Sequence, residues 1–111
     1  MQQQTNIVSL DKKININTVE KRPAIEIAAT NNSGISHNKY EKFDVGRQGI
    51  DINNTTKNPA KIILNEIISN DTTHINGNIN ILGDSKPHFI IANPSGIDYN
   101  DCNVTNVGRL T

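Results

Sequence analysis

Residues 50–53 read Ile-Asp-Ile-Asn, and residues 79–82 read Ile-Asn-Ile-Leu. In both stretches isoleucine occupies every second position, and a period of two places successive side chains on opposite faces of a β-strand. The same alternation is found in residues 14–17 (Ile-Asn-Ile-Asn) and 24–28 (Ala-Ile-Glu-Ile-Ala). These four stretches predict strands that bury one face and leave the other in contact with water.

Two other stretches are more continuously apolar, residues 62–68 (Ile-Ile-Leu-Asn-Glu-Ile-Ile) and residues 89–92 (Phe-Ile-Ile-Ala). Such runs are typical of strands that are covered on both faces. Residues 61–69 also fit an amphipathic helix, because Ile63 and Ile67 lie four positions apart. We favour a strand here, since β-branched isoleucines and a central asparagine lower helix propensity.

The composition indicates a chain of short strands and turns. It includes 18 isoleucines against four leucines, and 18 asparagines, while only 4% of the residues are aromatic. Isoleucine favours strands, whereas asparagine favours turns and forms hydrogen-bonded ladders in stacked β-structures. Disorder is the competing interpretation, because hydrophobic residues make up only 34% of the chain. A net charge of zero and the many β-branched residues argue against disorder.

Turn signals separate the apolar stretches at short intervals, so long loops are not needed. Short strands joined in this way fit a sandwich, a small barrel or a solenoid. Columns of isoleucine and asparagine are most useful where like residues stack from coil to coil, which favours a β-helix. The turn signals lie at residues 31–34, 46–49, 53–55, 76–77, 83–84 and 93–96.

Charge and cysteine content exclude several classes of function. Eleven basic and eleven acidic side chains cancel, so no basic surface for a nucleic-acid partner is expected. Cys102 is the only cysteine; it cannot form an internal disulfide, nor hold zinc without three other ligands. His37, His74 and His88 lack the spacing of a metal motif. We therefore expect no metal and no cofactor.

Enzyme and membrane motifs are also missing from the sequence. No nucleophile elbow, P-loop or dinucleotide fingerprint is found, which predicts that the chain is not an enzyme. No stretch approaches the roughly 18 apolar residues of a membrane-spanning helix, so stable membrane insertion is not expected. Residues 1–10 lack the basic start and apolar middle of a secretory signal, which predicts a cytoplasmic location for the chain expressed alone.

Two longer motifs resemble a known family. Residues 34–45 read Gly-Ile-Ser-His-Asn-Lys-Tyr-Glu-Lys-Phe-Asp-Val, and residues 90–97 read Ile-Ile-Ala-Asn-Pro-Ser-Gly-Ile. Together with their surroundings, over residues 22–111, they resemble the two-partner secretion domain, also called the haemagglutination activity domain. This domain heads filamentous haemagglutinins and other large exported adhesins, haemolysins and contact-dependent growth-inhibition toxins.

The resemblance implies an all-β fold, a right-handed parallel β-helix (solenoid) with an N-terminal cap. This fold agrees with the solenoid that the composition favours. Residues 1–21 would form an N-terminal lead-in or cap strand without a signal peptide, and residues 22–111 a partial two-partner secretion domain. Because family members continue through further coils, we expect the chain to be C-terminally truncated.

The resemblance also implies a function in secretion targeting. The domain would be recognised by the periplasmic domains of a dedicated outer-membrane transporter, and the full-length parent would be secreted or held at the cell surface. Extended, isoleucine-rich segments can add as strands to a sheet edge in such periplasmic domains. An open last strand is expected to favour self-association.

The two motifs supply the candidates for transporter recognition or for a fold signature. In the first motif, the structural interpretation is that residues 36–38 satisfy backbone groups at a cap or turn, and that the two aromatic residues plug the open end of the helix. In the second, residues 93–96 carry Asn, Pro and Gly where a type I turn prefers them. The candidates are Ser36, His37, Asn38, Tyr40, Phe43, Asn93, Pro94, Ser95, Gly96 and Ile97.

The sequence departs from the family pattern in its turns. The usual Asn-Pro-Asn-Gly is Asn-Pro-Ser-Gly at residues 93–96, and a second family turn, Asn-Pro-Asn-Leu, is reduced to Asn-Pro-Ala at residues 58–60. Two other functions stay open at this point. The chain could be a truncated remnant without an export role, or a small free adhesin that binds a host surface or a glycan.

Overall fold

The protein forms a β-solenoid in the computed structural model, which describes residues 5–10, 15–19, 22–100 and 102–111. Over these residues the chain contains strands, turns and loops but no helix. The strands are β1 (Asn6–Ser9), β2 (Asn15–Val19), β3 (Arg22–Glu26), β4 (Ile35–Asp44), β5 (Ile50–Asn53), β6 (Ile62–Ile67), β7 (Thr73–Ile75), β8 (Ile79–Leu82), β9 (His88–Ala92), β10 (Ile97–Tyr99), β11 (Val104–Thr105) and β12 (Arg109–Leu110).

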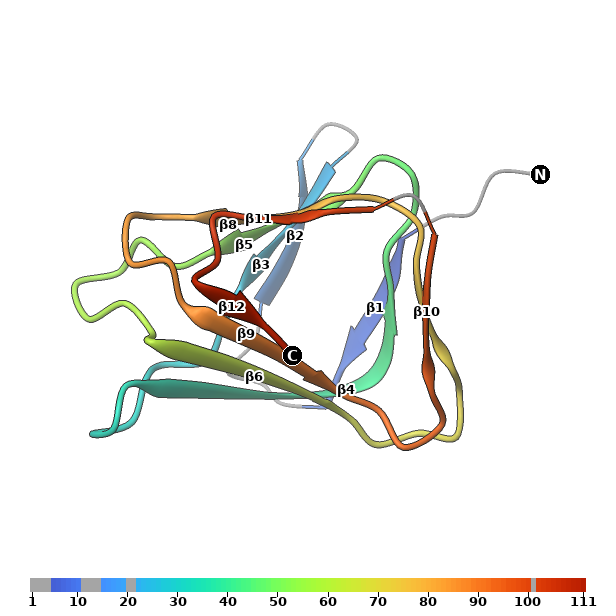
Figure 1. The fold of residues 1–111 in the computed structure, drawn as a ribbon, viewed down its shortest axis with the longest axis horizontal. Helices are drawn as coiled ribbons and strands as arrows, with labels where there is room; N and C mark the ends of the chain where they lie inside the picture. The colour runs from blue at the N-terminus through green and yellow to red at the C-terminus, as the bar shows by residue number, and fades with distance from the viewer. Residues whose placement is uncertain (1–4, 11–14, 20–21, 101) are drawn as a thin grey trace.

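The strands form three sheets that enclose a roughly triangular cross-section (Figure 1). The β4 sheet has the order β1-β4-β6-β9-β12, the β5 sheet has the order β2-β3-β5-β8-β11, and the β7 sheet pairs β7 with β10. Strands of successive coils pair in parallel. In Figure 1 the path runs counterclockwise as the chain comes toward the viewer, so the solenoid is right-handed. The expected right-handed parallel β-helix is confirmed.

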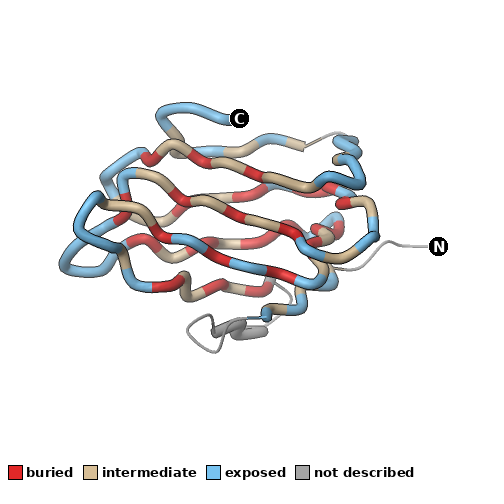
Figure 2. The backbone as a smooth tube through the Cα atoms, turned by 90° about the horizontal axis from the view of Figure 1, so that it is seen from below, coloured by how far each residue is buried: buried red, intermediate tan, exposed pale blue. Residues whose placement is uncertain are grey.

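The core consists of columns of like residues that stack from coil to coil. Ile25 pairs in register with Ile52, which pairs with Ile81, and all three side chains are buried. Ile50 and Ile79 form a second buried column. Buried positions alternate with partly exposed ones along the strands (Figure 2). The alternating isoleucines of the sequence therefore build the interior of the solenoid.

The expected strands are present, with small shifts at their ends. β5 and β8 coincide with the alternating stretches at residues 50–53 and 79–82. β3 begins and ends two residues before the stretch at 24–28, and β2 begins at Asn15, with residue 14 outside the described residues. The stretch within residues 61–69 forms strand β6, so the helical alternative is wrong.

The two continuously apolar stretches bury only one of their faces. In β6 and β9, every second residue is buried, whereas Ile62, Leu64 and Ile90 point outward and are only partly buried. The expectation of strands covered on both faces is wrong, because the outer face of the β4 sheet stays partly in contact with water.

Two antiparallel strands close the N-terminal end of the solenoid. β1 runs antiparallel to the second half of β4, from Asn6 opposite Asp44 to Ser9 opposite Tyr40. β2 runs antiparallel to β3 over its whole length. These strands pair with backbone edges of the first coil that would otherwise be open to another chain.

Candidate functional site

Ser36 and Asn38 face the interior near the start of β4 and hold the backbone of Ala28, and all three residues are buried. The Ser36 hydroxyl donates to the Ala28 carbonyl at 2.6 Å, and the Ala28 N–H donates to Asn38 Oδ1 at 2.9 Å. Asn38 Nδ2 donates to the Ser36 carbonyl at 3.1 Å and to Ser36 Oγ at 3.0 Å. These bonds satisfy buried polar groups at the corner between β3 and β4, as the structural interpretation expects for these two residues.

His37 points outward from the same strand, because side chains alternate along a strand. Its Nε2 lies 2.9 Å from Glu66 Oε1 on β6, and the two side chains are 43% and 44% exposed. A pair this exposed contributes at most about 1 kcal/mol to stability. His37 therefore takes no part in satisfying the corner backbone, and its imidazole is accessible to a partner.

Tyr40 and Phe43 are buried in the first coil, on the strand that pairs with β1. Their ring centroids lie 4.9 Å apart, and the ring planes are inclined by 59°. Burial raises the pKa of Tyr40 well above its usual range. The two aromatic residues of this motif thus belong to the hydrophobic core.

The second motif forms a tight turn between β9 and β10. The Gly96 N–H donates to the Asn93 carbonyl at 3.0 Å, and the Ser95 N–H donates to Asn93 Oδ1 at 2.9 Å. Gly96 has a φ of +104°, a conformation that favours glycine. Pro94 and Ser95 are exposed at the tip. This hydrogen-bonding pattern is that of a β-turn with proline at its second position.

The turn is also bonded to the preceding coil. Asn93 Nδ2 donates to the Asp71 carbonyl at 2.9 Å and to Thr73 Oγ1 at 2.8 Å. The Thr73 N–H donates to the Gly96 carbonyl at 3.0 Å, and Ile97 then pairs in register with Thr73. The turn therefore positions β10 on β7.

The two motifs lie on different coils, because β6 separates β4 from β9 in the sheet. No hydrogen bond between the motifs is present among the described residues. The ten candidates therefore do not converge on one pocket. His37, Pro94 and Ser95 are exposed side chains that a partner can contact, whereas the buried members shape the coils.

Sequence reasoning missed the buried side chain of Asn54. Its Oδ1 accepts the Ala60 N–H at 2.8 Å, and its Nδ2 donates to the Ala60 carbonyl at 3.1 Å and to Ser85 Oγ at 2.8 Å. Asn54 thus ties together two successive corners of the solenoid and holds the shortened Asn-Pro-Ala turn. In the sequence it looks like an ordinary turn residue, so no local signal could have identified it.

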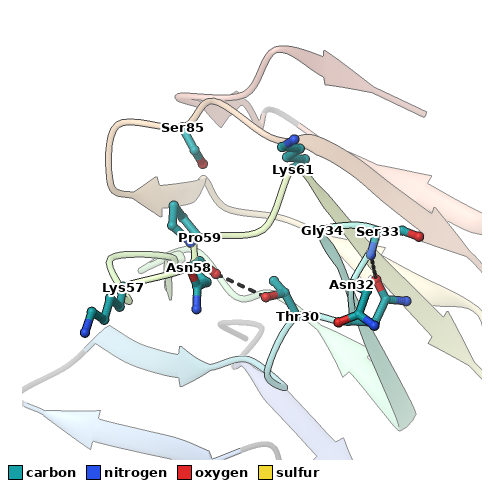
Figure 3. A pocket seen from close by; sticks show the side chains of 10 residues that line it. Thr30, Asn32, Ser33, Gly34, Lys57, Asn58, Pro59, Lys61 and Ser85 are labelled. Carbon is teal, nitrogen blue, oxygen red and sulfur yellow. Dashed lines mark hydrogen bonds between the residues drawn. The ribbon is translucent and has the colours of Figure 1, made fainter.

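An open polar pocket lies at the corner between the β5 and β4 sheets (Figure 3). Thr30 Oγ1 donates to the Asn58 carbonyl across it at 3.2 Å. Lys57 and Lys61 direct their ammonium groups away from each other at its rim (Figure 3). The polar groups of this pocket therefore do not converge on a ligand position.

The described residues contain no cluster of three or more His, Cys, Asp or Glu side chains able to hold a metal ion. Within the same part of the chain, no helix is long and apolar enough to cross a membrane.

Comparison with known proteins identifies the family to which this fold and these motifs belong. A family model described as the TPS secretion domain matches residues 2–111. The chain belongs to the TPS secretion domain family. The resemblance carried by the two motifs is thereby confirmed, and with it the assignment as a secretion-targeting domain, which is favoured over a remnant or a free adhesin.

Curated relatives of this TPS domain are large toxins and adhesins. The domain is 34% identical to the 16S rRNA endonuclease CdiA of Enterobacter cloacae, with 80% of this chain and 3% of that protein covered. It is 33% identical to the filamentous hemagglutinin of Bordetella pertussis, with 82% and 3% covered. The chain thus spans about 3% of the length of these relatives. The endonuclease activity in the name of the first relative belongs to that whole protein.

The solved structure of another secretion domain has the same solenoid architecture as this chain. The crystal structure of the filamentous hemagglutinin secretion domain superposes on this TPS domain with a TM-score of 0.82 and 25% sequence identity. The match covers 95% of this chain and 41% of that structure. Both therefore share the solenoid over nearly the whole length of this chain.

Proposed function

We propose that this TPS domain directs a longer polypeptide to an outer-membrane two-partner transporter, whose periplasmic domains recognise it. The observation that carries this proposal is the match to the TPS secretion domain over residues 2–111, on a solenoid with the architecture of a solved secretion domain. The longer polypeptide would be secreted or held at the cell surface, as an adhesin, a haemolysin or a growth-inhibition toxin. The domain itself would carry no catalytic activity and contact no nucleic acid.

We assign recognition by the transporter to the outward-facing side chains of the two motifs. His37 is accessible beside Glu66, and Ser95 is exposed at the tip of the second turn. The inward residues of the motifs would affect recognition only indirectly. Ser36, Asn38 and Asn93 form hydrogen bonds that fix the backbone of the corners next to the outward side chains. Extended segments of the chain could also add as strands to a sheet edge of the transporter.

The last described coil would serve as a template for further coils of the longer polypeptide. Leu110 pairs in register with buried Phe89, and Tyr99 with buried Ile75, yet Leu110 and Tyr99 are 44% and 45% exposed. These side chains end two interior columns without being covered, so a further coil would bury them. Without such a coil, this edge would favour self-association.

We also propose that the chain divides into an N-terminal lead-in or cap at residues 1–21 and a partial two-partner secretion β-helix at residues 22–111. The pairing of β1 with β4 and of β2 with β3 supports this division into a cap and a solenoid. The cap would give the first coil a finished end on which parallel stacking begins.

The test is transporter-dependent secretion of the full chain. The chain is directed to the periplasm by an added secretory signal, with or without coexpression of a two-partner transporter. We expect the chain in the medium only when the transporter is present. Equal release without the transporter, or no binding to its purified periplasmic domains, would overturn the proposal.

A variant series locates the contact. His37→Ala is expected to weaken binding to the periplasmic domains with little change in thermal unfolding, because its contact with Glu66 is exposed. Glu66→Gln, which removes the partner charge but keeps His37, is the matched control. Unchanged binding of His37→Ala would remove His37 from the recognition surface.

A further inference from the structure

Two polar atoms in the core of the first two coils have no hydrogen-bond partner among the described residues: the hydroxyl of Tyr40 and Oδ1 of Asn65. Both residues are 0% exposed. Tyr40 lies on β4, and Asn65 lies on the neighbouring strand β6. A buried polar group without a partner lowers the stability of the folded state, because unfolding returns it to water.

The neighbouring Asn38 shows that this fold can satisfy a buried asparagine fully. Asn38 pairs in register with Asn65 and is equally buried. Both its Oδ1 and its Nδ2 are hydrogen-bonded within the first corner. Asn65, by contrast, uses only Nδ2, which donates to the Ile90 carbonyl at 2.9 Å. In the next coil the same column continues with the apolar Ile91.

Packing does not require the hydroxyl of Tyr40. Its ring packs against the ring of Phe43, and a phenylalanine at position 40 would preserve this contact without the polar atom. β4 and β6, which join the first two coils, thus carry two buried polar atoms that find no hydrogen-bond partner within the described part of the chain.

We infer that the buried polar atoms of Tyr40 and Asn65 lower the stability of the first two coils, an effect that we term a stability brake. The brake raises the fraction of chains whose β4 and β6 backbone is unpaired. This inference rests on the strand-addition route of the proposed function, not on the outward side chains, because those unpaired backbones are what the periplasmic domains of the transporter would bind by strand addition. In the folded solenoid the backbone N–H and C=O groups of these strands pair β4 with β6 and β6 with β9, so folding competes with binding to the transporter. The apparent affinity for the transporter is then proportional to the unfolded, binding-competent fraction, which the brake increases.

The first arm of the test measures stability by chemical denaturation of the full chain. Tyr40→Phe is expected to raise the folding equilibrium constant about 5- to 30-fold. Tyr99→Phe is the matched control at a 45% exposed position, where no change is expected. Asn65→Val should also stabilise the chain, whereas Asn38→Val should destabilise it because every bond of Asn38 is lost. Lower stability of both Tyr40→Phe and Asn65→Val would overturn the inference, because the two atoms would then have partners in solution.

The second arm measures binding to the purified periplasmic domains and transporter-dependent secretion. Tyr40→Phe is expected to weaken apparent binding and slow secretion by the same factor by which it stabilises the chain. Adding Ile81→Ala, a buried core truncation away from β4 and β6, should restore both. If the wild-type chain is not secreted, the proposed function fails. If the wild-type chain is secreted and the stabilised variant is secreted equally fast, only the brake fails.

Discussion

Asn93 on the turn after β9 donates through Nδ2 to the hydroxyl of Thr73 on β7, at 2.8 Å. The bond links the turn after β9 to β7, the strand of the preceding coil on the same side of the solenoid. The backbone bond from the Thr73 N–H to the Gly96 carbonyl completes the link. One asparagine thus closes its own turn and fixes the stacking of the next strand.

Replacing Asn93 with alanine should destabilise the chain by about 1 to 3 kcal/mol, because buried Thr73 and the Asp71 carbonyl both lose their hydrogen bonds to its amide. Urea denaturation measures the change. Ser95→Asn, which creates the family turn Asn-Pro-Asn-Gly at an exposed position, should leave the free energy of unfolding nearly unchanged. Equal effects of the two changes would mean that the turn depends on its tip rather than on Asn93.

Replacing Gly77 with alanine should prevent correct stacking of two coils. A Cβ at this position would lie 1.9 Å from the Gly46 carbonyl oxygen and 2.9 Å from the Gly49 nitrogen, both backbone atoms that cannot move aside. We expect a loss of more than about 4 kcal/mol, or failure to fold. Circular dichroism and thermal melting give the readout.

Gly96→Ala serves as the comparison for Gly77→Ala. Gly96 has a positive φ, but the nearest atom to an added Cβ is 4.0 Å away, on the Thr72 side chain. Only backbone strain of about 1 to 3 kcal/mol is expected. A larger loss at Gly96 than at Gly77 would show that backbone strain outweighs the close approach of the coils.

Tyr40 should make the folded chain sensitive to alkaline pH. Burial raises its pKa above the ordinary value of 10.0, so the folded chain keeps the phenolic proton at a pH where the unfolded chain loses it. This contribution is fully present below about pH 10 and falls as the pH rises further, by up to about 1.4 kcal/mol per pH unit. Urea titrations between about pH 8 and pH 11.5 should show a steeper decline for the wild type than for Tyr40→Phe. Parallel declines of the two proteins would place Tyr40 in contact with water.

Leu110→Lys should reduce self-association of the isolated chain. Leu110 is 44% exposed at the edge of the last described coil, and a charge at an edge strand opposes pairing with another chain. Sedimentation velocity at several concentrations measures the effect. Val8→Lys introduces the same charge at a 39% exposed position on β1, at the opposite end. If only Val8→Lys lowers association, the chains associate through the cap instead.

Much of the fold was predictable because the core of a solenoid repeats the same local pattern. The alternation in residues 50–53 and 79–82 predicts β5 and β8 correctly, and these strands lie side by side in register. Residues 62–68 and 89–92 misled the prediction of burial. Their outward isoleucine and leucine side chains sit on a sheet face that local hydrophobicity cannot distinguish from a covered one.

The candidate site was only partly predictable. The motifs were found in the sequence, but their inward and outward members were not separated. His37 lies between Ser36 and Asn38 in the chain, yet it faces Glu66 outside while its neighbours bond Ala28 inside. Asn54 was missed because its partners lie on two different corners of the solenoid.

The sequence by itself determined that this protein is a chain of short strands and tight turns with an isoleucine core, because strand period and turn chemistry act between residues that are near one another. Only the tertiary structure decided which asparagines are satisfied. Asn38 and Asn65 have the same side chain and the same burial, and they pair in register. They differ in where their partners lie: Asn38 bonds Ser36 and the Ala28 backbone in its own corner, whereas Nδ2 of Asn65 donates to the Ile90 carbonyl of the next coil. A hydrogen bond depends on the position of its partner, and the folded path of the chain sets that position.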